Sequence, residues 1–200
     1  MYNSFQIFTP QKKFRLTTNQ IFYPSFIFLL FLFFEIKTQP YHFFLLIILF
    51  VQFLISIYLS GYRMYRIKPF EGELNGKILF ETNSLIINQN KIDISEIHSL
   101  NIFIGDYYGK TNLYNSTYRH NLNPLASNGT NNWIEYHLIN GETNKLFFQQ
   151  EYEAQKESIR PFLIALIKRN ILSITQVLTI LEIEDEYFIQ LFLRELELTN

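Results

Sequence analysis

The sequence predicts an α+β membrane protein in which a transmembrane helical hairpin is followed by a small antiparallel β-sandwich, closed by a helix, and then by a helical tail. Three observations lead to this prediction. They are two long apolar runs near the start of the chain, a series of short alternating segments, and a change to helical spacing near residue 159. We therefore expect five regions, namely an N-terminal segment (1–20), the hairpin (21–60), a linker (61–70), the α+β domain (71–169) and the tail (170–200).

The two apolar runs have the length of membrane spans. Residues 21–34 read IFYPSFIFLLFLFF, and the uncharged stretch extends back to Leu16; residues 41–60 read YHFFLLIILFVQFLISIYLS. A helix rises about 1.5 Å per residue, so roughly 20 apolar residues cross a hydrocarbon core of about 30 Å. Because only EIKTQP separates the runs, the two spans must be antiparallel neighbours.

Two other interpretations of the first run are weaker. A cleaved signal peptide would use the preceding basic residues as its charged start, but no small-x-small cleavage site follows Phe34 and a second apolar run comes directly after it. A buried helical hairpin of a soluble protein is also disfavoured, because apolar residues surround both predicted helices and leave no polar face.

Basic residues flank the hairpin on the side of both chain termini. The positive-inside rule therefore predicts a two-pass protein of the cell (inner) membrane with both termini in the cytoplasm. We expect the same residues to interact with anionic membrane lipids at the surface. They are Lys12, Lys13, Arg15, Arg63, Arg66 and Lys68.

Charge and cysteine content limit the possible partners. Residues 1–68 carry seven basic residues and one acidic residue, so the rest of the chain holds ten basic and seventeen acidic residues. Such an acidic part repels phosphate backbones, which excludes nucleic acid as a partner. The chain has no cysteine, which removes disulfides and thiolate metal sites and fits a reducing cytoplasm. No motif calls for a cofactor.

From residue 73 the sequence alternates with a period of two, as strands do. KILFET, LIIN and KIDI form a first group of predicted strands, and residues 100–104, WIEYHLI and KLFFQQ form a second. WIEYHLI places Ile134, Tyr136 and Leu138 on one face. Trp133, if it is buried with Ile102 and Phe148, would be a core residue.

The last third of the chain has helical spacing. Pro161 either kinks a helix that runs from Glu153, which we prefer, or lies in the first turn of a helix capped by Ser158. In the tail, Ser173 and Gln176 match a capping box, and Asp185 can cap a last helix. Packing of these tail helices onto the sandwich is the preferred interpretation, with a docking surface for a partner as the alternative.

Three phrases of the domain resemble a known family. GKILFETNSLIINQNKIDISEIHSLNI, GDYYGK and SNGTNNWIEYHL are similar to the pleckstrin-homology-like domains of small bacterial membrane proteins, which follow one or two spans. The resemblance covers roughly residues 71–169 and implies a pleckstrin-homology-like fold with a binding or scaffolding role. Phosphoinositide-binding members carry clustered basic residues at the first hairpin. Here Lys77 and Lys91 stand among acidic residues, which disfavours headgroup recognition there.

The connection from Gly105 to Asn132 is the main candidate for function. Loops of this length without secondary structure are usually functional or disordered, and a flexible insertion is the equally open alternative. Its rings and hydrogen-bond donors suit a binding surface. The candidate ligand- or partner-binding residues are Tyr107, Tyr108, Lys110, Tyr114, Tyr118 and Arg119.

Two functional hypotheses follow from these patterns. In the first, the protein is a membrane-anchored binding or scaffold module that engages a protein partner and has no catalytic activity. In the second, it is a membrane-anchored enzyme that acts at the bilayer surface through polar loop residues. Glu135 and His137 alternate on one predicted strand, but solvent-facing alternation explains them better than a metal site, so no catalytic or metal-binding residue is assigned. A cluster of perturbed titratable residues in one pocket would favour the enzyme.

Overall fold

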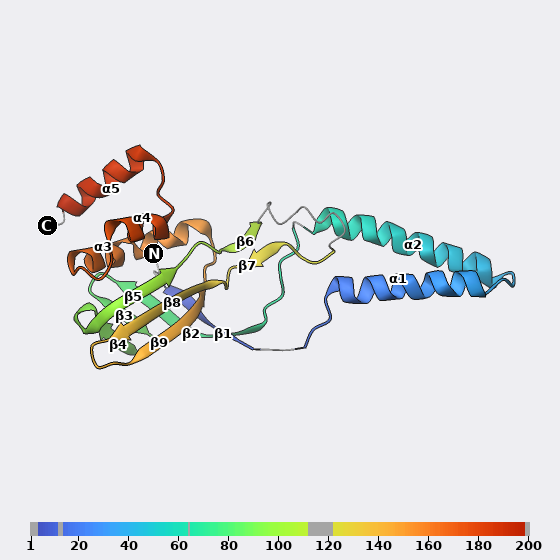
Figure 1. Cartoon of the computed structure of the whole chain (residues 1–200), viewed down its shortest axis with the longest axis horizontal. Coiled ribbons are helices and arrows are strands. Elements are labelled where there is room, and N and C mark those ends of the chain that lie inside the picture. Colours follow the sequence, from blue (N-terminus) through green and yellow to red (C-terminus); the bar gives the residue numbers. More distant parts are fainter. Residues whose placement is uncertain (1–3, 12–13, 64, 112–121, 199–200) are drawn as a thin grey trace. The chain divides into compact units, whose positions relative to one another are not determined.

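The computed structural model describes residues 4–11, 14–63, 65–111 and 122–198 (Figure 1). The chain divides into two compact units, which we describe separately. One unit contains residues 13–69 and 111–126 and holds the two long apolar helices. The other contains residues 1–12, 70–110 and 127–200 and forms the α+β domain.

The described residues include two helices that are long and apolar enough to cross a membrane, α1 (Thr18–Glu35) and α2 (Tyr41–Tyr62). Helix α1 begins with a capping box between Thr17 and Gln20. Neither helix buries a single described residue, and Phe44 of α2 is 58 % exposed. This exposure of large apolar side chains is typical of helices that face lipid.

Polar side chains join the two helices within this apolar surface. The amide of Gln52 in α2 donates to Ser25 Oγ at 2.9 Å and to the Phe22 carbonyl oxygen at 3.4 Å in α1. Near the other end of the pair, the His42 ring stacks on Phe33 with 4.1 Å between centroids. Hydrogen bonds of this kind hold neighbouring helices together in apolar surroundings.

The described part of the α+β domain is built on one seven-stranded antiparallel sheet with the order β4-β3-β2-β1-β9-β8-β5. The α+β class and most of the predicted strands are therefore confirmed. The strands of the sheet are β1 (Ser4–Pro10), β2 (Gly72–Glu81), β3 (Ser84–Ile87), β4 (Asn90–Asp93), β5 (Ile97–Phe103), β8 (Asn132–Leu138) and β9 (Thr143–Gln149).

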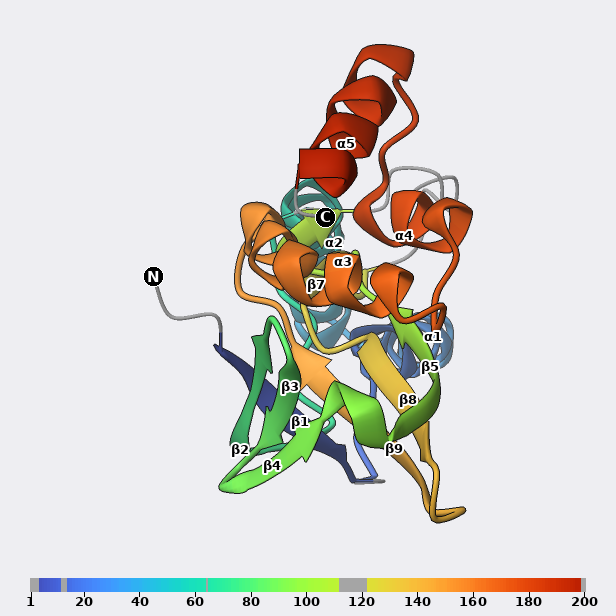
Figure 2. The same ribbon diagram turned by 90° about the vertical axis from the view of Figure 1, so that its left-hand side faces the viewer.

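The sheet curls into a partly open barrel. Its edge strands β4 and β5 are connected by the short 3-10 helix η1 (Ile94–Glu96), which Asp93 caps through the Ser95 backbone N–H. A flat seven-stranded sheet would separate its edges by about 29 Å, whereas the step from Asp93 to Ile97 covers at most about 14 Å. The two edges must therefore approach each other at this corner, as Figure 2 shows.

Strand β1 was not predicted from the sequence, and it occupies the middle of the sheet. It pairs with β2 on one side and β9 on the other. Phe5 of β1 is 1 % exposed and contacts Phe80 and Phe148 edge-on, with centroids 5.5 and 5.2 Å away. The segment before the helical hairpin is thus an integral part of the core of the domain.

The concave face of the sheet packs against helices. The 3-10 helix η3 (Glu153–Ile159) leads into α3 (Arg160–Lys168), whose Phe162 is fully buried with its ring centroid 5.4 Å from that of Phe80. The preferred kinked helix is wrong, because Pro161 lies in the first turn of α3 instead. There its missing N–H costs nothing, since the first N–H groups of a helix lack partners anyway.

The tail forms two more helices, α4 (Ile174–Leu181) and α5 (Glu186–Leu198). The capping box of Ser173 and Gln176 is confirmed. Asp185 accepts a hydrogen bond from the Tyr187 backbone N–H at 2.9 Å, as a cap does. Figures 1 and 2 show that α3, α4 and α5 all lie on the same side of the sheet.

Trp133 is not buried together with Ile102 and Phe148, so it is not a core residue. Ile134 and Tyr136 of β8 face the concave core, as predicted, so the intervening residues face the convex side. Trp133 is half-buried there, and the Lys145 ammonium lies 4.1 Å from the centre of its ring. It pairs with Phe103 and Phe147 rather than with the core residues Ile102 and Phe148.

Candidate functional site

The ends of the connection between β5 and β8 are held by hydrogen bonds. Strand β6 (Tyr108–Thr111) and strand β7 (Ala126–Asn128) pair in a short two-stranded sheet. At the first residue of β6, the Tyr108 N–H donates to the Gln150 carbonyl oxygen at 2.9 Å, and directly after β7 the Gly129 carbonyl oxygen accepts from the Gln150 N–H at 2.9 Å. At least these parts of the connection are ordered.

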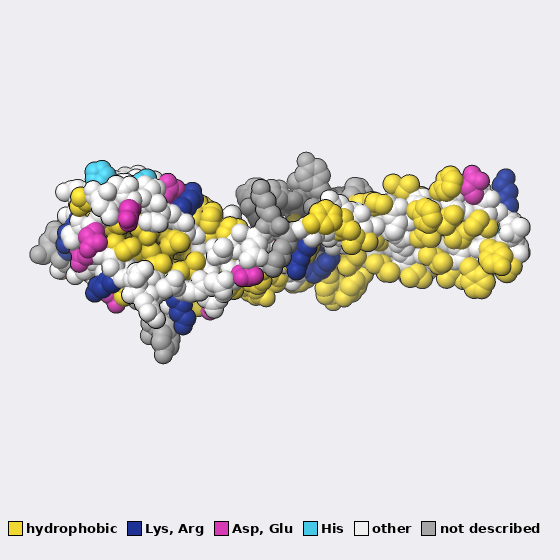
Figure 3. Space-filling view, turned by 90° about the horizontal axis from the view of Figure 1, so that it is seen from below, with side chains coloured by type: hydrophobic (Ala, Val, Ile, Leu, Met, Phe, Trp, Pro, Cys, Tyr) yellow, Lys and Arg dark blue, Asp and Glu magenta, His cyan; other side chains and the backbone are white. Residues whose placement is uncertain are grey.

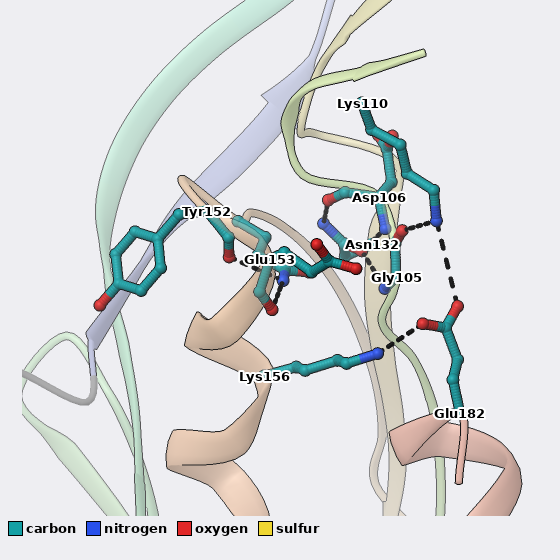
Figure 4. A network of polar contacts seen from close by, with 9 residues as sticks. Gly105, Asp106, Lys110, Asn132, Tyr152, Glu153, Lys156 and Glu182 are labelled. Carbon is teal, nitrogen blue, oxygen red and sulfur yellow. Dashed lines mark hydrogen bonds and ion pairs between the residues drawn. The ribbon is translucent and has the colours of Figure 1, made fainter. Parts of the chain in front are cut away.

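Asn132 is the centre of this network (Figure 4). Its side chain is fully buried at the first position of β8. Its Oδ1 accepts hydrogen bonds from the backbone N–H groups of Gly105 at 3.0 Å and Asp106 at 2.9 Å. Its Nδ2 donates to the carbonyl oxygens of Asp106 at 2.6 Å and Gly129 at 2.9 Å. One side chain therefore ties the end of β5 to the start of β8.

The carboxylate of Asp106 adds a second tie across the connection. It accepts hydrogen bonds from Ser127 Oγ at 2.7 Å and from the Asn131 N–H at 3.0 Å. Gly129 lies between these two donors with φ +75°, and a Cβ there would overlap the Gln150 carbonyl oxygen. Only glycine fits this close approach of two chain segments.

Charged side chains surround the network on its helical side. Lys156 of η3 is only 8 % exposed and forms an ion pair with Glu182, the residue that ends α4. Lys110 donates to the Gly105 carbonyl oxygen, and its Nζ lies 4.0 Å from the same Glu182 carboxylate. Figure 4 shows both lysines directed toward this one carboxylate.

Glu182 adopts a backbone conformation that its residue type disfavours. Its φ of 55° and ψ of 40° lie in the left-handed region, where helices usually end in glycine or asparagine. A glutamate nevertheless occupies this strained position, and its carboxylate balances the charge of the buried Lys156 and approaches Lys110. A nearly buried lysine without such a partner is costly.

Tyr107 lies beside the same charges. Burial and the neighbouring Glu153, which is also its hydrogen-bond partner, raise the pKa of the Tyr107 hydroxyl above its usual value. The Lys110 ammonium lies 5.6 Å from the centre of the Tyr107 ring. A tyrosine phenol is protonated at neutral pH in any case, so Tyr107 is a hydrogen-bond donor there, and the raised pKa extends this state to more alkaline pH.

The structure brings only some of the predicted site residues together. Tyr107 and Lys110 join the network, and Tyr108 projects from it with 48 % of its surface exposed. Tyr114, Tyr118 and Arg119 lie outside the described residues. Sequence reasoning missed the residues that build the network, which are Asp106, Asn132, Lys156 and Glu182.

The predicted membrane-surface residues differ in their surroundings. Arg63 is 8 % exposed, and Arg66 donates to the Leu122 carbonyl oxygen at 3.0 Å and to Thr18 Oγ1 at 3.4 Å. These two arginines thus contribute to the packing of the helical unit. Arg15 and Lys68 are exposed, while Lys12 and Lys13 lie outside the described residues.

Glu135 and His137 face the convex side of the sheet, as solvent-facing alternation predicts. Lys145 pairs with Glu135 at 3.0 Å, and His137 Nδ1 lies 2.7 Å from Thr143 Oγ1. Across the described ranges, no group of three or more His, Asp or Glu side chains is placed to hold a metal ion.

Comparison with known proteins identifies no relative of this chain. The chain matches no protein-family model, no curated protein and no solved structure.

Proposed function

We propose that this chain is a two-pass membrane protein that holds a pleckstrin-homology-like domain in the cytoplasm as a binding or scaffold module for a protein partner. Helices α1 and α2 are its anchor, and both chain termini lie on the cytoplasmic side. The segment from Gly105 to Lys110 and the connection that follows it provide the partner-binding surface.

The observation that carries the anchor is the pairing of β1 with β2. Strand β1 ends at Pro10, before α1, and β2 begins at Gly72, after α2, yet the two strands are antiparallel neighbours in one sheet. Strands of one sheet share a compartment, so the chain between them crosses a membrane an even number of times. Two spans satisfy this requirement. Cleavage after a signal peptide would instead remove the central strand of the sheet.

The orientation rests on the basic residues at the base of the hairpin. Arg15 and Lys68 are exposed on the two connections between the hairpin and the sheet, whereas the turn between the helices offers Lys37 offset by Glu35. Positive residues are retained on the cytoplasmic side during insertion. The domain is therefore cytoplasmic.

The pleckstrin-homology-like assignment rests on the curled antiparallel sheet with a helix packed on its concave face, together with the three phrases that resemble that family. Binding is supported by the network around Asn132. Its hydrogen bonds and ion pairs hold Gly105 to Lys110 rigidly while Tyr108 stays exposed. Rigid aromatic residues on a supported loop lose little entropy when a partner binds, and tyrosine is frequent at interface hot spots.

Cysteine labelling in intact cells tests the topology. Because the chain has no native cysteine, Thr38→Cys in the helical turn and Thr82→Cys in the β2–β3 turn each introduce a single thiol at an exposed position. We expect a membrane-impermeant maleimide to label position 38 in intact cells and position 82 only after lysis. Labelling of both positions from the same side would refute the two-pass anchor.

Photo-crosslinking tests the binding surface. A photoreactive phenylalanine analogue at Tyr108 is compared with the same analogue at Tyr152, because these tyrosines are 48 % and 49 % exposed. We expect a discrete crosslinked protein at position 108 and none at position 152. The same products at both positions, or none at 108, would contradict a partner surface at this segment.

A further inference from the structure

A row of apolar side chains crosses the convex face of the sheet. Strand register aligns one residue from each of five neighbouring strands. We call this set the aromatic row; its members are Leu74, Phe8, Phe147, Trp133 and Phe103. Figure 3 shows hydrophobic side chains gathered over the α+β domain on the face seen from below.

Four of the five members of the row reach the surface, whereas Phe8 is only 8 % exposed. Phe103 is 46 % exposed, and Trp133, Phe147 and Leu74 are half-buried. Helices α3, α4 and α5 pack on the concave side of the sheet (Figure 2), and α4 reaches the row only at Trp133, which lines a hollow with Thr175 and Thr179. Contiguous apolar surface on a folded domain usually marks a contact with another molecule or with a membrane.

One end of the row lies where the chain leaves for the candidate spans. Phe8 precedes the end of β1 by two residues, and Leu74 follows the start of β2 by two residues. Residues 11–17 lead from there to α1, and residues 63–71 lead back from α2. Neither connection reaches beyond roughly 35 Å even when fully extended. This corner of the sheet is therefore kept within a short distance of the bilayer.

The two connections to the helices are basic, whereas the helical tail is acidic. Lys145 lies over the Trp133 ring of the aromatic row, and Arg15 and Lys68 are exposed on the two connections. The acidic residues of the tail belong to the helical side instead; they include Glu184, Asp185, Glu186, Glu195 and Glu197. An anionic membrane would attract the basic connections and repel the acidic tail.

The side chains themselves suit the interfacial region of a bilayer. Tryptophan and lysine are typical of that region, where the ring contacts acyl chains and the ammonium reaches the headgroups. Here Lys145 lies over the Trp133 ring at 4.1 Å and also pairs with Glu135 at 3.0 Å. The face is convex and shallow, a shape that a bilayer accommodates without a matching pocket.

We propose that the aromatic row is a membrane-docking face, which lays the convex side of the domain on the interfacial region of the bilayer that α1 and α2 anchor. The proposal rests on the anchor proposed above. Docking leaves the segment from Gly105 to Lys110 available to a protein partner and orients the helical side away from the membrane.

The test uses the fluorescence of Trp133, which is the only tryptophan of the chain. The full-length protein is reconstituted in vesicles of phosphatidylcholine and phosphatidylglycerol, with or without lipids brominated on the upper part of the acyl chain. We expect brominated lipid to quench most of the Trp133 emission and aqueous acrylamide to quench little of it. Quenching by acrylamide but not by brominated lipid would overturn the proposal, and a protein-binding face would give that result.

A matched control moves the tryptophan to the helical side of the domain. Trp133→Phe with Tyr187→Trp places the indole on α5 at a position that is 67 % exposed. We expect this variant to be quenched by acrylamide and not by brominated lipid. Equal lipid quenching of both proteins would also overturn the proposal, because it would reflect nonspecific adsorption of the domain.

Alkaline carbonate extraction of the same vesicles separates the two proposals. If the chain is extracted with soluble proteins, the anchor itself is wrong. If the chain stays in the membrane and Trp133 is not quenched by lipid, only the docking face is wrong. Phe103→Ser, at an exposed position, should weaken lipid quenching while leaving the domain folded, as judged by far-ultraviolet circular dichroism.

Discussion

The helical hairpin and the α+β domain are rich in the same types of apolar residue, but the hairpin exposes them and the domain buries them. Phe44 of α2 is 58 % exposed, whereas Phe5 of β1 is 1 % exposed. The apolar side chains of the hairpin point outward, and those of the domain surround a core. The difference shows that the residue type alone does not define a core; the solvent around each region decides which direction an apolar side chain takes.

The hairpin and the domain also differ in how many hydrogen bonds one polar side chain makes. In the hairpin, Gln52 makes two hydrogen bonds to the neighbouring helix. In the domain, Asn132 makes four bonds within 3.0 Å and fixes a whole connection. A buried polar group in a water-soluble domain must find partners inside the fold.

Phe5→Ala should have the largest effect on stability. Removing a fully buried ring from the centre of the sheet costs about 3–5 kcal/mol. Phe44→Ala, on the outward face of α2, should leave the unfolding of the domain unchanged. Urea unfolding in detergent micelles, followed by Trp133 fluorescence, measures both variants. Equal effects of the two substitutions would show that the hairpin and the domain are not separately stabilised.

Asn132→Ala should come next. It leaves the backbone N–H groups of Gly105 and Asp106 without their acceptor, and each unsatisfied buried group costs about 1–3 kcal/mol. Gln52→Leu in the hairpin should cost only about 0.6 kcal/mol, as for typical polar contacts between membrane helices. The same unfolding measurement compares them. A larger loss for Gln52→Leu would contradict the division between the two regions.

Helix α5 is less firmly packed than the sheet, because Phe192 is its only buried residue within the described part of the chain. A substitution at its contacts should therefore cost less stability than the two core substitutions. Arg160 holds α5 through an ion pair with Glu195 at 3.1 Å and by lying 5.3 Å from the centre of the Phe192 ring. Arg160→Met should lower global stability by about 1 kcal/mol or less, yet accelerate hydrogen exchange selectively in α5. Uniform acceleration across the sheet would show that α5 belongs to the main cooperative unit.

The smallest effect concerns alkaline pH. Burial raises the pKa of Tyr136 above its usual value of 10.0. The folded domain therefore holds this proton more tightly than the unfolded chain, so stability falls as the pH rises through and above 10.0. Tyr136→Phe should flatten that decline between pH 9 and about 11. An unchanged slope in pH-dependent urea unfolding would contradict a buried phenol at this position.

Much of the fold could be predicted because its signals are local. The alternation of Ile134 and Tyr136 and the capping box at Ser173 depend only on nearby residues, and the structure confirms both. Strand β1 was missed because its partners lie far along the chain, Phe5 opposite Ile78 and Ile7 opposite Phe148. Trp133 is large and apolar, but its place in the alternation puts it on the convex face.

The candidate site was less predictable for the same reason. Tyr107, Tyr108 and Lys110 stand in one short phrase, whereas Lys156 and Glu182 come from helices far along the chain and share no motif. One signal was present, since Asn132 occupies the alternation of Ile134 and Tyr136 and is thus a polar residue at a core-facing position. Nothing in the sequence around Glu182 indicates a left-handed helix end.

The position of the hairpin inside the domain has a consequence for biosynthesis. If α1 and α2 span a membrane as proposed, β1 has no partner until the hairpin has been inserted and β2 and β9 have been made. With that anchor, a chain that inserted only one helix would leave β1 on the far side of the bilayer, and the remaining strands would lack the strand that joins β2 to β9. Completion of the sheet would then report on correct insertion, and wrongly inserted chains would expose unpaired strand edges of the kind that chaperones and proteases act on.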